Sequence, residues 1–118
     1  MNESSATTLD RDADIDRVVD ALSVSTRRGL LRLVRTDERT AGDLAAHFPE
    51  ISRPAVSQHL RVLSDAGLVS VRPEGRRRLY SARVEALAPV STFIEEMWRD
   101  RLVDLKRAAE ARERGVHS

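Results

Sequence analysis

Apolar residues recur at helical spacing near the beginning of the chain. A first set lies on one side of a predicted N-terminal helix and consists of Ile15, Val18, Val19 and Leu22. This helix should begin near Asp10 or Asp12, because a carboxylate suits the positive end of the helix dipole. A second helix is predicted from Ser25, as its cap, to about Arg35. Residues 1–9 lack this pattern, so we expect them to be a flexible polar tail.

Two shorter helices are predicted in the middle of the chain, each between residues that favour helix ends. Thr40 and Asp43 resemble a capping box, and Pro49 ends the helix that follows. Ser52 can cap the next helix, with a proline in its first turn, and Gly67 stands where a left-handed glycine usually ends a helix. The apolar face of this fourth helix consists of Val56, Leu60 and Leu63.

The pattern changes to alternation after the fourth helix. Residues 69–81 alternate on both sides of a turn at residues 73–76, which predicts a β-hairpin. A long helix follows, opened or bent by Pro89, and residues 114–118 are expected to be a flexible tail. The apolar stripe of this long helix consists of Val90, Phe93, Ile94, Met97, Trp98, Leu102 and Leu105. The expected fold is therefore mainly α with a small β-hairpin, a winged helix-turn-helix within one domain at residues 10–113.

Composition excludes several classes of protein. The 118 residues include no cysteine, which rules out disulfides, thiolate metal sites and cysteine nucleophiles. No apolar run approaches the roughly 18 residues that a membrane span needs, and the N-terminus lacks the basic and apolar regions of a signal peptide. We therefore expect a cytoplasmic protein without a membrane partner.

The net charge of +1 conceals a strongly uneven distribution. Residues 1–20 sum to −4, whereas residues 53–83 hold seven arginines against two carboxylates and sum to +5. A solvated basic surface would explain this concentration as well as a phosphate-binding face would. The concentration becomes informative because it coincides with the predicted fourth helix and hairpin.

The fourth helix has the two faces that a DNA-reading helix needs. Opposite its apolar face project short or forked hydrogen-bonding groups, which can engage base edges in the major groove. The arginines of the hairpin suit the minor groove or the backbone. The predicted DNA-binding residues are Thr40, Ser52, Arg53, Pro54, Ser57, Gln58, His59, Arg61, Arg76, Arg77 and Arg78. Alternatives remain open, since Ser52 could be only a cap, Arg61 only solvated, and His59 packed against the core.

The chain resembles the ArsR family of winged-helix repressors. The resemblance lies in SRPAVSQHLRVL at 52–63, AGLV at 66–69, EGRRRLY at 74–80 and STRR at 25–28, and it extends over residues 15–107. It implies a homodimer, joined through the first and last helices, that represses transcription from a palindromic DNA operator. The interface would use the apolar residues of those two helices that are named above. The resemblance also implies that an effector, often a metal, binds to many family members and releases the DNA.

This sequence departs from the metal-sensing pattern. It has no cysteine, and His117 is the only histidine in the C-terminal region. The sequence therefore predicts no metal site and no cofactor, and the effector stays unknown. A protein-interaction module that has lost DNA binding is the alternative function. An enzyme is not expected, because the histidines are scattered at 47, 59 and 117 and no nucleophile, phosphate loop or carboxylate pair accompanies them.

Overall fold

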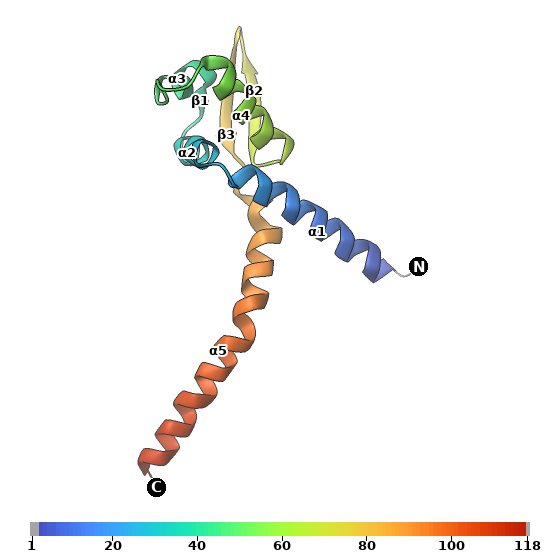
Figure 1. Ribbon diagram of the computed structural model, residues 1–118, viewed down its shortest axis with the longest axis vertical. Helices are drawn as coiled ribbons and strands as arrows, with labels where there is room; N and C mark the ends of the chain where they lie inside the picture. Colours follow the sequence, from blue (N-terminus) through green and yellow to red (C-terminus); the bar gives the residue numbers. More distant parts are fainter. Residues whose placement is uncertain (1–2, 118) are drawn as a thin grey trace.

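The computed structural model describes residues 3–117, with the side chains of residues 10–115. In chain order the elements are α1 (Glu3–Leu22), α2 (Ser25–Leu33), β1 (Arg39–Thr40), α3 (Ala41–Ala46), α4 (Arg53–Asp65), β2 (Val69–Glu74), β3 (Arg77–Ala82), the 3₁₀ turn η1 (Val84–Leu87) and α5 (Ala88–His117). Figure 1 shows α2, α3, α4 and the strands gathered in one head, from which α1 and α5 extend in two directions. The predicted winged helix-turn-helix fold is confirmed.

The core of the head lies where α2, α3 and α4 meet the end of α1 and the start of β2. It consists of Val18, Ala21, Leu30, Val34, Leu44, Val56, Leu60, Leu63, Leu68 and Val69. The predicted apolar face of α4 is fully buried there. Truncating one of these leucines to alanine would cost about 2–5 kcal/mol, which is a large part of a small domain's stability.

The limits of α4 follow from the residues that flank it. The Ser52 hydroxyl oxygen accepts a hydrogen bond from the Ala55 N–H at 3.2 Å, and Pro54 occupies the first turn, where a missing N–H costs nothing. At the other end Gly67 adopts a φ of +77°, a conformation that strains residues with a side chain. The predicted start and end of this helix are confirmed.

The wing is a three-stranded antiparallel sheet in the order β1-β3-β2. Glu74 pairs with Arg77, so the turn between β2 and β3 is the two-residue segment Gly75-Arg76, with Gly75 at a φ of +61°. The prediction that the turn spans residues 73–76 was too wide. Pro73 is accommodated within β2 because this strand lies at the edge of the sheet, where no neighbour needs its missing N–H.

Both terminal helices are longer than the sequence predicts. The expected N-terminal tail is helical from Glu3, since no glycine or proline interrupts the chain before Leu22. The expected C-terminal tail is helical to His117, because one glycine, at a cost of about 1 kcal/mol, does not stop a long helix. Residues 1, 2 and 118 lie outside the described residues. Ser25 is the first residue of α2 rather than its cap, which is Val24 without a side-chain hydrogen bond.

Candidate nucleic-acid interface

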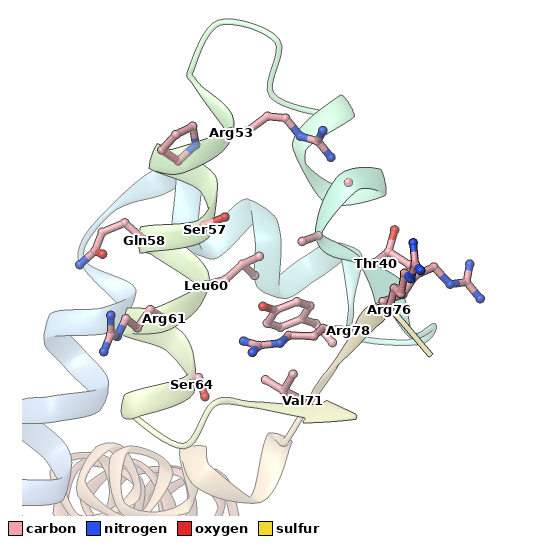
Figure 2. A pocket seen from close by; sticks show the side chains of 15 residues that line it. Thr40, Arg53, Ser57, Gln58, Leu60, Arg61, Ser64, Val71, Arg76 and Arg78 are labelled. Carbon is pink, nitrogen blue, oxygen red and sulfur yellow. The ribbon is translucent and has the colours of Figure 1, made fainter. Parts of the chain in front are cut away.

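A groove of about 1030 Å³ lies between α4, the start of α3 and the hairpin (Figure 2). Its lining residues are Thr40, Ala41, Gly42, Arg53, Pro54, Ser57, Gln58, Leu60, Arg61, Ser64, Val71, Arg76, Arg77, Arg78 and Tyr80. The structure thus brings together nine of the eleven residues that the sequence predicts to bind DNA. They come from positions 40 to 78 of the chain, and the fold places them around a single hollow.

The exposed side of α4 supplies the hydrogen-bonding groups of the groove. Figure 2 shows Gln58 and Arg61 projecting from the same side of the helix, one turn apart, while Arg53 extends from another side toward α3. Gln58 and Arg61 are exposed, and so is Ser57 between them and the wing. This face is polar because the apolar face of the same helix is committed to the core.

Arg53 lies directly against the first turn of α3. A Cβ atom added to Gly42 would lie 2.8 Å from Arg53 Nη2, so the guanidinium occupies the space that a side chain at position 42 would need. The Thr40 hydroxyl caps the same turn by accepting the Asp43 N–H at 3.1 Å, and the Asp43 carboxylate accepts from Arg39 at 2.9 Å. A side chain at position 42 would displace the end of the Arg53 side chain, a relation that only the structure reveals.

The hairpin places its side chains on two faces by strand alternation. Arg78 pairs with Pro73 and Tyr80 with Val71, so these four residues share the face toward α4. On the other face, Arg72 binds Glu38 through two hydrogen bonds, Nε to Oε2 at 3.0 Å and Nη2 to Oε1 at 2.9 Å. These hydrogen bonds lower the pKa of Glu38 and tie β2 to the loop that precedes β1.

The charge of the groove has one sign. Five of its lining residues are arginines, and no aspartate or glutamate is among them. Arg77 lies 3.9 Å from Glu74, a loose ion pair. Across the described part of the chain, Arg53, Arg61, Arg76 and Arg78 have no carboxylate within ion-pair distance. Guanidiniums in this condition remain available to phosphate oxygens or guanine edges.

Two predicted residues lie outside the groove. Ser52 is the cap of α4, which was one of the interpretations left open. His59 faces the other side of α4, where its Nδ1 lies 3.2 Å from Arg27 Nη1 and its ring is partly buried. Burial and the neighbouring Arg27 charge lower the pKa of His59. His59 thus contacts Arg27 of α2 and not the groove, so its predicted contact with DNA stays a prediction that this position does not support.

Six groove residues were missed in the sequence analysis, which assigned Leu60 only to the buried face of α4: Ala41, Gly42, Leu60, Ser64, Val71 and Tyr80. Alternation along the hairpin is a signal that could have found Val71 and Tyr80, since they share a face with Arg78. Ser64 lies seven residues after Ser57, two turns along the same face of α4. Ala41 and Gly42 gave no signal, because their place depends on how α3 packs beside α4.

The apolar stripe of α5 lies in the open. Phe93 is 45% exposed, Met97 61% and Trp98 55%, and Ile94, Leu102 and Leu105 are about as exposed. In α1, Val19 is exposed, and Ile15 and Leu22 are partly buried. Val18 is corrected from an interface residue to a core residue, because only 3% of it is exposed. Val90 also packs partly against the core.

The described residues contain neither a membrane-spanning helix nor a cluster of metal-binding side chains. None of the helices from Glu3 to His117 combines the length and hydropathy that crossing a membrane requires. Over the same part of the chain, no three histidine, aspartate or glutamate side chains gather closely enough to hold a metal ion.

Comparison with known proteins identifies the family. Residues 25–71, from the start of α2 into β2, match the family model described as bacterial regulatory protein, arsR family. The HTH-type transcriptional regulator Rv2034 of Mycobacterium tuberculosis is 42% identical over 83 residues, which cover 70% of this chain and 77% of that protein. The chain belongs to the arsR family. The predicted resemblance is confirmed, and the family is one of transcriptional regulators rather than enzymes.

Two more relatives of this arsR-family regulator are informative. The transcriptional repressor SdpR of Bacillus subtilis is 38% identical over 73 residues, which cover 62% of this chain and 80% of that protein. Among solved structures, a homodimeric winged helix-turn-helix DNA-binding domain from Mycobacterium bovis matches with a TM-score of 0.61 and 26% identity. The match covers 86% of this chain and 91% of the chain from Mycobacterium bovis.

Proposed function

We propose that this arsR-family regulator is a homodimeric repressor that binds a palindromic operator in double-stranded DNA through the groove between α4 and the wing. The supporting observation is the composition of that groove, where five arginines meet an exposed amide and no carboxylate. Such a surface suits a phosphate backbone, whereas the core of a protein interface is depleted in charged residues. The named function of the relative from Bacillus subtilis supports the role of repressor.

The proposed mechanism divides the groove between reading and anchoring. An α-helix fits the major groove of B-DNA, where Gln58 can engage adenine and Arg53 or Arg61 can engage guanine in bidentate pairs. Each good pair discriminates against a wrong base by about 1–3 kcal/mol. Arg76, Arg77 and Arg78 then contact the backbone or the minor groove, which positions the protein without selecting a sequence. Thr40, Pro54 and Ser57 complete the contact surface around them.

The homodimer is proposed from the apolar stripe of α5. A row of exposed large side chains on a helix that leaves the head is a poor surface for a monomer in water. A twofold axis would bury it against its own copy, together with the exposed part of α1. The homodimeric structure from Mycobacterium bovis supports this arrangement. Two α4 helices related by that axis would read two half-sites about one helical turn apart.

Selection of bound fragments from genomic DNA, followed by sequencing, tests the proposed function. The expected result is a palindromic sequence, bound as a dimer and with much higher affinity than a scrambled duplex in fluorescence anisotropy. Equal affinities for the selected sequence and the scrambled duplex would contradict sequence-specific binding. Failure to bind any DNA at low salt would favour the protein-interaction module. Because such binding takes place on the genome, we also propose the cytoplasm as the compartment, with no cofactor.

A further inference from the structure

A second groove shares no lining residue with the proposed DNA interface. It has a volume of about 250 Å³ and lies between α2 and the connection from β3 to η1. Its walls combine two kinds of side chain. Six are apolar, namely Leu22, Leu31, Leu68, Ala82, Val84 and Leu87, and four are arginines, namely Arg28, Arg32, Arg35 and Arg83. No carboxylate lines it.

The four guanidiniums differ in their partners. Arg28 donates to the Leu22 carbonyl oxygen at 2.7 Å, and Arg83 donates from Nε to Glu85 Oε1 at 3.3 Å. Arg32 and Arg35 are exposed and, within the described residues, their side chains make no hydrogen bond or ion pair. Two unpaired cations therefore stand at the edge of an apolar hollow.

The structure of the single chain explains only some of the arginines around this groove. Arg32 lies in the last turn of α2, where the helix dipole favours a cation. The same dipole does not account for Arg83, which reaches the groove from the opposite wall, after β3. Arg28 and Arg32 are one turn apart on α2, and like charges at this spacing repel each other. An anion between the arginines would relieve that repulsion.

We propose that this groove binds a small amphipathic anion with a single aliphatic tail and a carboxylate head. The tail lies along the apolar walls, and the head receives hydrogen bonds from Arg32 and Arg35, whose forked donors match a carboxylate. The groove is slightly smaller than the usual pocket for a drug-sized ligand, which limits the occupant to one short chain. Charge complementarity and apolar walls are both required, so neither a simple anion nor an alkane suffices.

The walls of the groove connect it to the two helices that extend from the head. Leu22 is the last residue of α1, and Leu87 is the last residue before α5 begins. An occupant would therefore contact the chain at the end of α1 and just before the start of α5, the two helices proposed to form the dimer. Binding to this groove goes beyond the proposed DNA-binding function and is measured on the protein without DNA.

Calorimetric titration with hexanoate, heptanoate and octanoate, all below their micelle concentrations, tests the site. Affinity should rise about fourfold for each added methylene that enters the groove. Acetate, which has the head alone, and octanol, which has the tail alone, should each bind at least tenfold more weakly than octanoate. Equal binding of acetate would reduce the site to a surface cation, and equal binding of octanol would reduce it to an apolar crevice. Either outcome overturns the proposal.

Single variants locate the binding site. Arg32→Gln and Arg35→Gln should each weaken octanoate binding about tenfold, because each removes a charge-assisted hydrogen bond. Val84→Phe, at an exposed wall position, should block the tail, while Arg112→Gln on distant α5 is the matched control and should change nothing. Circular dichroism confirms that each variant is folded. If octanoate does not bind and Arg35→Gln instead weakens the dimer, a second copy of the chain covers the groove and the proposal is wrong.

Discussion

Loss of Arg78 should change how operator affinity depends on salt. Arg78 lines the groove from the face of β3 that it shares with Tyr80, and no described carboxylate lies within ion-pair distance. Each phosphate contact contributes about −0.9 to the slope of log affinity against log salt concentration. Arg78→Gln, acting once in each subunit of a dimer, should therefore flatten the slope by about 1.8. A fourfold rise in salt would then cost the variant roughly twelvefold less affinity than it costs the parent protein.

The assay is fluorescence anisotropy with operator and scrambled duplexes over a salt series. Gln58→Ala provides the contrast, because it should leave the slope nearly unchanged while reducing the ratio of specific to non-specific affinity. Arg112→Gln, which removes a charge far from the groove, controls for net charge. An unchanged slope for Arg78→Gln would remove the phosphate contact from this residue. Equal losses on both duplexes for Gln58→Ala would show that the reading face of α4 is misassigned.

Three further predictions concern the interface, His59 and metals. Trp98→Ala removes the largest exposed side chain of the α5 stripe, so it should weaken the dimer at least tenfold in sedimentation equilibrium, and an unchanged dimer constant would contradict the proposed interface. The lowered pKa of His59 means that the folded state takes up a proton less readily than the unfolded state. The free energy of unfolding should therefore be highest above the ordinary histidine pKa of 6.5 and should fall as the pH drops below it. Chemical denaturation across this pH range should show that the stability of His59→Gln falls less in acid than that of the parent protein. An identical dependence on pH would show that His59 is not the residue responsible. Zinc, nickel and arsenite at low micromolar concentration should leave operator affinity unchanged, whereas a tenfold loss reversed by a chelator would reveal a metal site.

The sequence predicted those parts of the fold that local chemistry determines. The limits of α4 are set locally, by the cap at Ser52, by Pro54 in the first turn and by Gly67 after the last turn. Alternation gave the hairpin in the same way, because one face of the sheet must meet α4. Most of the proposed DNA groove followed, since its arginines and amide lie on these two elements.

Features that depend on distant partners could not be predicted. The strand β1 contains only Arg39 and Thr40, and it exists because these residues pair with Tyr80 and Leu79 of β3. Helical periodicity placed His59 only near the edge of the buried face of α4. Its true neighbour, Arg27, comes from another helix. Such pairings leave no periodic trace in the sequence and appear only when the elements are packed together.

Arg27 connects the proposed dimerisation helix α1 to the proposed reading helix α4. Its Nε donates to the Ala21 carbonyl oxygen at 2.7 Å, its Nη2 donates to the Asp20 carbonyl oxygen at 3.1 Å, and its Nη1 donates to His59. A guanidinium only donates, so the Nδ1 of His59 must accept and carry no proton. One side chain thus couples the last turn of α1 to the middle of α4. In a dimer built on α1 and α5, the angle at which two subunits meet would thereby set the separation of two reading helices. A change at the interface of such a dimer would then move the two reading helices relative to each other, while the side chains on each helix stay in place.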